Sequence, residues 1–196
     1  MKRAPLTAEA IIADAADLAD EAGFDEVTLS EVARRLGVRT PSLYSHVRDL
    51  AALRDGISAL ALSELGDRIS LGIAGRSGRL ALRGLAEAHR AFARESPGRW
   101  QSLLRRAGAS GVGSEAARRV VALTDAVLLG YGLPPEDRVH AIRLIGSTIA
   151  GFLVLERVGS FSHRPPASEV SWQKAIDALD VLLHAWPAEA EPREPP

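Results

Sequence analysis

The chain contains no cysteine among its 196 residues, and aromatic residues make up only 5% of it. The absence of cysteine excludes disulfide bonds, thiolate zinc sites and thiol nucleophiles. No apolar run looks long enough to cross a bilayer, and the N-terminal stretch MKRAPLTAEA lacks the apolar segment of a signal peptide. We therefore expect a cytoplasmic protein that does not associate with membranes.

Motifs of catalysis are also missing. The chain has no Gly-x-Ser-x-Gly motif, no Glu-x-x-His pair of the kind that builds metal sites in helical bundles, and no glycine-rich phosphate loop that follows a strand. No stretch shows the alternating pattern of a β-strand. The sequence thus predicts an all-α protein that is not an enzyme and needs no metal or cofactor.

The formal net charge of -1 gives no overall attraction to nucleic acid, but the charges are unevenly distributed. Acidic residues gather before residue 27, whereas basic residues gather at the N-terminus and between residues 34 and 48. The acidic group is Asp14, Asp17, Asp20, Glu21, Asp25 and Glu26, and the basic group is Lys2, Arg3, Arg34, Arg35, Arg39 and Arg48. The basic residues are therefore local to one part of the chain.

Residues 28–47, TLSEVARRLGVRTPSLYSHV, show the pattern of two short helices joined by a glycine turn. Thr28 followed by Glu31 is a capping box at the start of the first helix. Gly37 can take the left-handed conformation that ends a helix, and Thr40 followed by Pro41 is predicted to cap and restart one. Apolar residues at helical spacing give the pair a core face, namely Leu29, Val32, Ala33, Leu36, Leu43 and Val47.

The second of these helices carries polar side chains on the sides that do not face the core. Leu43 and Val47 lie four residues apart and occupy one face. A buried helix would not carry polar groups on its other three sides, so we predict that this helix meets double-stranded DNA. The predicted DNA-contacting set, including the starts of both helices, is Thr28, Arg39, Thr40, Pro41, Ser42, Tyr44, Ser45, His46 and Arg48.

The run GVRTPSLYSHV resembles the recognition helix of the tetracycline repressor family of bacterial transcription regulators. In that family a Gly-Val turn, a Pro or small residue, and Leu-Tyr-x-His-Phe/Val recur in this order. The similarity covers roughly the first quarter of the chain. Family members often carry a lysine that anchors a phosphate at the start of the next helix. Leu50 occupies that position here, and Arg48 is the nearest substitute.

Different side chains are expected to read bases and to hold phosphates. Arg39 and Thr40 at the helix start, with the two serines, are best placed to contact base edges in the major groove. The resemblance implies that Tyr44 and His46 contact phosphates and so set the register. Backbone N–H groups at both helix starts can add phosphate contacts. The basic residues of the N-terminal arm either reach a minor groove or make no contact.

Helical patterns continue through the rest of the chain. A helix capped by Thr7 should end at Gly23, and a longer one should run from Asp49 to the glycine-rich stretch at 72–78. Further helices are expected at about 79–95, 114–131, 136–158 and 168–185, and a short helix or turn is expected at 100–107. We predict a helix-turn-helix DNA-binding domain over 1–48, a ligand-sensing and dimerisation domain over 49–186, and a disordered tail over 187–196, which is rich in proline and glutamate.

The last two helices carry an apolar stripe together with small residues. The resemblance implies that this pair meets its two-fold mate in a four-helix dimer interface. The residues predicted for that interface are Ile142, Ile145, Gly146, Ile149, Leu153, Ile176, Leu179 and Leu183. A monomeric helical core with tight packing is the alternative.

A sensing pocket would need apolar walls and a few polar groups inside the second domain. The candidates are His89, Phe92, Trp100, Leu104, Tyr131, Thr148, Phe152 and Trp172. Together with the resemblance, they predict a ligand-responsive regulator, most simply a repressor, that binds a palindromic operator as a homodimer and is released by a small-molecule effector. The alternative is a helical protein-interaction module without ligand sensing.

Overall fold

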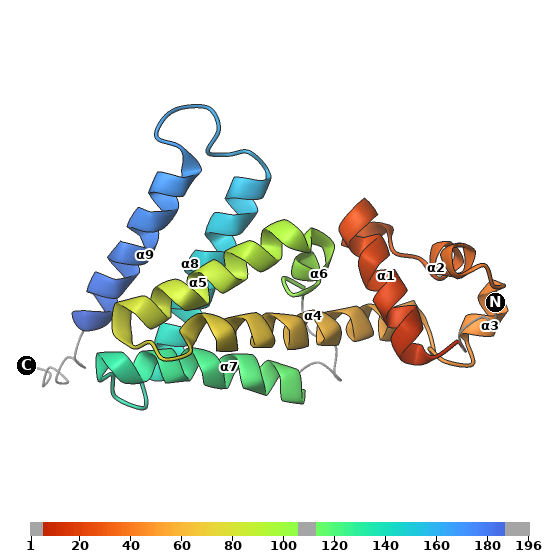
Figure 1. Cartoon of the computed structure of the whole chain (residues 1–196), viewed down its shortest axis with the longest axis horizontal. Coiled ribbons are helices and arrows are strands. Elements are labelled where there is room, and N and C mark those ends of the chain that lie inside the picture. Colours follow the sequence, from red (N-terminus) through yellow and green to blue (C-terminus); the bar gives the residue numbers. More distant parts are fainter. Residues whose placement is uncertain (1–5, 106–112, 187–196) are drawn as a thin grey trace, which may run out of the picture. The chain divides into compact units, whose positions relative to one another are not determined.

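The computed structural model describes residues 6–105 and 113–186. Within these residues all the regular elements are helices, which confirms the predicted all-α class (Figure 1). The tail at 187–196 and the arm residues Lys2 and Arg3 lie outside the described residues.

The helices follow one another in an order close to the one predicted. They are α1 (Ala8–Ala22), the short 3-10 helix η1 (Phe24–Glu26), α2 (Leu29–Leu36), α3 (Thr40–Leu43), α4 (Leu50–Ile73), α5 (Gly78–Glu95), α6 (Pro97–Ser102), α7 (Glu115–Leu128), the 3-10 helix η2 (Leu129–Tyr131), α8 (Arg138–Arg157) and α9 (Ser168–His184). Helix α6 begins earlier than predicted, because Pro97 stands in the first turn, where its missing N–H is not needed.

The chain divides into two compact units, which contain residues 1–71 with 88–123 and residues 72–87 with 124–196. The predicted boundary near residue 48 falls inside the first unit, and it stays a prediction about function. Within the first unit, residues 6–55 hold the two helices of interest, and we call this segment the head.

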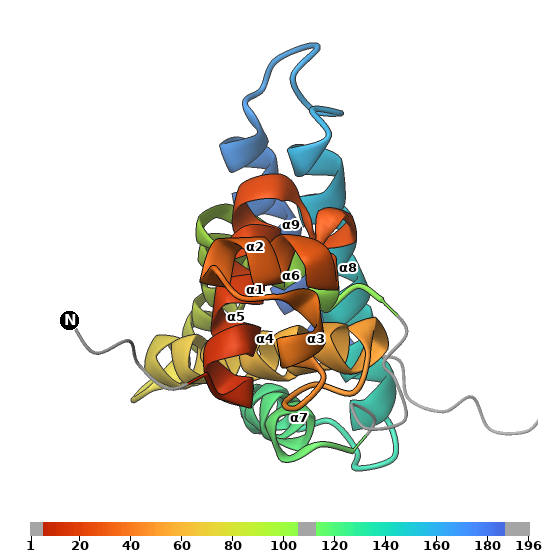
Figure 2. The ribbon, with the colours of Figure 1, turned by 90° about the vertical axis from the view of Figure 1, so that its right-hand side faces the viewer.

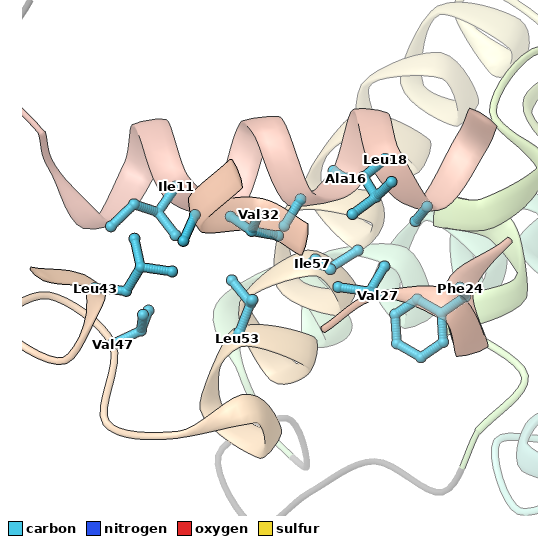
Figure 3. Close-up of a cluster of buried hydrophobic side chains, with 13 residues drawn as sticks. Ile11, Ala16, Leu18, Phe24, Val27, Val32, Leu43, Val47, Leu53 and Ile57 are labelled. Atoms are coloured by element: carbon cyan, nitrogen blue, oxygen red, sulfur yellow. The ribbon is translucent and has the colours of Figure 1, made fainter. Parts of the chain in front are cut away.

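One apolar cluster holds the head together (Figure 3). Helix α1 contributes Ile11 and Leu18, α2 contributes Val32, and the segment after α2 contributes Leu43 and Val47. All five are at most 6% exposed. The core faces predicted for the helix pair are thus confirmed, with Leu29 and Leu36 only partly buried at the edge of the cluster.

Helix α1 is also fastened on its acidic side, by α6. The backbone N–H of Arg99 donates to Asp20 Oδ1 at 2.8 Å, and the Arg99 guanidinium donates to Asp17 Oδ1 at 2.7 Å and to the Asp20 carboxylate. Gly98 lies so close to α1 that a Cβ there would overlap the carbonyl group of Ala19. The contact therefore requires glycine at position 98.

In the second unit, hydrogen bonds between buried or half-buried groups connect residues that are far apart in the sequence. Trp172 Nε1 donates to Glu87 Oε1 at 2.7 Å, and the Tyr131 hydroxyl donates to Asp180 Oδ1 at 2.7 Å. In this unit α8 and α9 lie side by side (Figure 1).

Helix α8 corrects the expectation that no apolar segment is long enough to cross a bilayer. Over its length it has a mean hydropathy of 1.5, so by length and composition alone it could cross a membrane. Only 22% of that apolar window is buried inside the protomer. A single helix of this kind is weak evidence for a membrane span.

Substituting Gly98 tests the contact between α6 and α1. Gly98→Ala should lower the free energy of unfolding by about 1 to 3 kcal/mol, because the added methyl group overlaps backbone atoms that cannot move aside cheaply. Gly66→Ala is the matched control, since a Cβ on Gly66 would meet its nearest neighbour at an ordinary 3.7 Å. Urea unfolding followed by circular dichroism measures both, and equal stability of the two variants would contradict the contact.

Candidate nucleic-acid interface

The turn between α2 and α3 forms through the local hydrogen bonds that its sequence predicts. The Thr28 hydroxyl accepts the N–H of Glu31 at 3.2 Å and so caps α2. At the other end Gly37 has φ 61° and ψ 37°, the left-handed conformation that glycine adopts without steric cost. The N–H of Val38 then donates to the carbonyl of Ala33 at 2.9 Å. These local hydrogen bonds define where α2 begins and ends.

The start of α3 differs from the prediction. Thr40 is not the cap: Arg39 holds that position with ψ 142°, and Thr40 and Pro41 are the first helical residues. The turn is this short because Val38 already packs on the head cluster, so the helix can begin directly after Arg39.

The end of α3 also differs, because its α-helical part stops at Leu43. The next residues continue as a hydrogen-bonded turn, in which the N–H groups of His46 and Val47 both donate to the Leu43 carbonyl at 2.9 Å. This tightening brings Val47 back into the core, where it is 6% exposed.

The predicted DNA-contacting residues are exposed, with one exception. Figure 2 looks onto this part of the first unit, with α2 and α3 toward the viewer. Thr40 is half-buried, whereas Tyr44 is 55% exposed. The remaining exposed members are Thr28, Arg39, Pro41, Ser42, Ser45, His46 and Arg48. The head therefore presents hydroxyl, imidazole and guanidinium groups to solvent.

Most of the positive charge in the head is engaged within the chain. Four of its five arginines have partners: Arg34 with Glu31, Arg35 with Glu21 and Asp14, Arg48 with Asp49, and Arg54 with the carbonyls of Asp25 and Val27. The Arg39 side chain has no hydrogen bond or ion pair with residues 6–55, all of which the structure describes. Arg39 is thus the arginine most available to an external anion or base.

The eight residues predicted for a ligand pocket are divided between the two units. His89, Phe92, Trp100 and Leu104 belong to the first, and Tyr131, Thr148, Phe152 and Trp172 to the second.

Several of these eight side chains already have packing roles. Phe92 and Trp172 are 0% exposed and Trp100 is 3% exposed, whereas Leu104 is 45% exposed. Burial lowers the pKa of His89 to about 4, so this histidine is neutral near pH 7. The ligand pocket stays a prediction.

Within the described residues a cavity of about 380 Å³ opens at the connection between α8 and α9. Its lining contains none of the eight predicted pocket residues and consists of Glu156, Gly159, Phe161, Ser162, Arg164, Pro165, Ala167 and Ser168. Sequence reasoning missed it because the segment has no helical pattern that would place its side chains.

The residues predicted for a dimer interface lie mostly in the interior of the protomer. The buried ones are 1% to 4% exposed and comprise Ile145, Ile149, Leu153, Ile176, Leu179 and Leu183, while Ile142 is half-buried and Gly146 is exposed. These buried side chains cannot meet a partner, so any pairing surface must use the other side of the same helices. That side, here called the exposed α8–α9 face, carries Gly146, Gly151, Val154, Leu155, Val158, Val170, Val181 and Leu182.

Two protein families match separate parts of the chain. Residues 11–55 match the bacterial regulatory proteins of the tetR family, and residues 82–179 match the tetracyclin repressor-like C-terminal domain. The chain is 32% identical over 154 residues to the uncharacterized HTH-type transcriptional regulator YobS of Bacillus subtilis, covering 78% of this chain and 80% of that protein. It is also 32% identical over 158 residues to the uncharacterized HTH-type transcriptional regulator Rv0681 of Mycobacterium tuberculosis, covering 80% and 72%.

Solved structures share the helical architecture. Apo ActR from Streptomyces coelicolor superposes with a TM-score of 0.74 at 17% identity, covering 93% of this chain and 96% of that one. A TetR variant from Acinetobacter baumannii AYE in complex with minocycline gives 0.70 at 22% identity, covering 94% and 100%. Identities this low show the fold alone. The family matches and the sequence relatives go further: the chain belongs to the tetR family of bacterial transcriptional regulators and carries its DNA-binding helix-turn-helix.

Proposed function

We propose that this regulator is a repressor that binds a palindromic operator as a homodimer in the cytoplasm and leaves it when a small-molecule effector binds. The observation that carries the DNA part is Arg39, an exposed and unpaired guanidinium at the N-cap of the recognition helix. In helix-turn-helix proteins the N-terminal residues of that helix contact base edges. A guanidinium there matches the O6 and N7 acceptors of guanine in the major groove.

The neighbouring groups fit phosphate contacts that set the register. Tyr44 and His46 lie on the turn after α3 and are exposed. Because contacts of this kind carry little sequence information, Tyr44 and His46 position the helix while Arg39 and the serines discriminate between bases.

The exposed α8–α9 face supports the homodimer. Helix α8 is apolar along its length but mostly uncovered in the protomer, and a second copy of the same helix pair would cover it in a four-helix arrangement. A Cβ on Gly146 or Gly151 would meet no atom within 4 Å, so these positions leave room for a partner backbone. The dimer must place its two recognition helices about 34 to 36 Å apart, the spacing of successive major grooves.

Ligand sensing is proposed from the second family match and from the relative that binds minocycline. An effector releases DNA only if it binds more tightly to a conformation whose heads no longer match the operator. Arg99 of α6 is hydrogen-bonded to α1, so a shift of α6 in such a conformation would move α1 and the head with it.

Replacing Arg39 tests base readout. Arg39→Ala should weaken binding to the operator by about 1 to 3 kcal/mol and binding to random duplex much less, since only the operator offers the specific base contact. Fluorescence anisotropy with the promoter fragment of the regulator's own gene and with a random duplex measures both losses.

Arg164→Ala serves as the control for Arg39→Ala, because Arg164 is an exposed arginine of the second unit. Equal losses on both duplexes would reduce Arg39 to a phosphate contact. Failure of the unmodified chain to bind any duplex would contradict the proposed function.

Charging the exposed α8–α9 face tests the dimer. Val181→Arg should convert the dimer to monomer, because pairing would bury an unpaired guanidinium. Leu71→Arg is the matched control, since Leu71 is 79% exposed on α4 and Val181 is 66% exposed on α9. Analytical ultracentrifugation distinguishes the species, and a dimer that survives Val181→Arg would place the interface elsewhere.

A further inference from the structure

Arg48 and Asp49 form an ion pair between the turn that follows α3 and the start of α4. One oxygen of Asp49 accepts the backbone N–H of Ala52 at 2.7 Å, and the other accepts Arg48 Nε at 2.9 Å. The bond from Ala52 is the main reason why the pKa of Asp49 lies below its usual range, with Arg48 second. Asp49 is therefore ionised at any pH near neutrality, and its carboxylate is fixed at the start of α4.

This one carboxylate engages two groups that attract phosphate. The first is the N-terminus of α4, where the backbone N–H groups of the first turn and the helix dipole favour an anion. The second is Arg48, which is exposed and lies two residues after His46. A phosphate that approaches Arg48 meets the Asp49 carboxylate beside it, so the attraction of the guanidinium is largely cancelled.

We propose that Asp49 is a built-in attenuator of DNA affinity: it holds Arg48 away from the phosphate backbone and keeps a negative charge at the start of α4. This inference rests on the proposed DNA binding. Exposed ion pairs are individually weak, and Arg48 alone would exchange partners freely. Asp49 does not exchange, because its bond to Ala52 anchors it, and the repulsion it exerts on DNA is therefore permanent.

Attenuation has a functional consequence for a repressor that must leave its operator. An effector shifts the balance between bound and free states only by its differential affinity. A head with fewer phosphate contacts requires a smaller differential, so a given effector releases it more completely. Asp49 thus acts as a positioning residue for Arg48 and tunes the response of the regulator.

Replacing Asp49 by asparagine removes the negative charge but keeps a side-chain oxygen that can accept the N–H of Ala52 and cap α4. Asn caps a helix about as well as Asp, so Asp49→Asn should leave the thermal unfolding midpoint unchanged while releasing Arg48. One new phosphate contact per head steepens the plot of log K against log salt by about 0.9. The same slope makes binding about eightfold tighter per head at 0.1 M salt, and the gain vanishes toward 1 M.

The experiment measures the affinity of the full chain for a random duplex and for its promoter fragment between 0.05 and about 0.3 M NaCl, the range over which counterion release dominates. Glu26→Gln is the control for net charge. Glu26 belongs to η1, which contains Phe24, and Phe24 lies at the opposite end of the head cluster from Leu43 and Val47 (Figure 3). Asp49→Asn should raise affinity and slope on both duplexes, and Glu26→Gln should change neither by a comparable amount.

A double-mutant cycle then assigns the gain to Arg48. Asp49→Asn should raise the affinity of a chain that carries Arg48, and it should not raise affinity in the Arg48→Ala background. Asp49→Ser, which also caps, should reproduce the gain of Asp49→Asn. A gain that persists without Arg48 overturns the holding role of Asp49.

The outcomes distinguish this inference from the proposed function. Salt-dependent DNA binding that Asp49→Asn leaves unchanged overturns the inference alone. Failure of the unmodified chain to bind any duplex at low salt overturns the proposed function and the inference with it. A loss of affinity in Asp49→Asn, at an unchanged unfolding midpoint, shows that the carboxylate supports DNA binding and overturns the attenuator.

Discussion

Helix α1 is the element on which the first unit depends, because two different interactions use its opposite sides. Its apolar side, with Ile11 and Leu18, forms the head cluster against α2 and the recognition turn. Its acidic side is bound by Arg99 of α6 at Asp17 and Asp20. The recognition helix has only one turn of its own, and so it is positioned by burial against α1 and not by its own hydrogen bonds.

The charges of the head are mostly cancelled within the chain, and this shapes how it can bind DNA. Glu31 pairs with Arg34, Glu21 and Asp14 pair with Arg35, and Asp49 pairs with Arg48, so these acids reduce the attraction between the arginines and a phosphate. Arg39 stands at the N-cap of α3, and its side chain forms no ion pair with residues 6–55, which the structure describes throughout. A net charge of -1 is thus compatible with a DNA-binding regulator whose specificity rests on few, well-placed cations.

The sequence was a good guide wherever a signal is local. Thr28, Gly37 and the spacing of Leu43 and Val47 each act within a few residues, and the structure shows the cap, the left-handed turn and the buried face that they predict. The bounds of α3 were less well predicted, since Thr and Pro can occupy either the cap or the first turn. Only the docking of Val38 on the head cluster selects between them.

By itself the sequence determined the helical class, the helix-turn-helix and its exposed polar set, because capping and 3.6-residue periodicity are properties of short segments. Tertiary structure alone decided which side of α8 and α9 is buried and which is exposed. Both helices are apolar on more than one side, so periodicity could not tell the protomer core from the exposed α8–α9 face. Burial of Ile149 and Ile176 in the interior of the protomer made that choice, because a side chain can fill only one of the two environments.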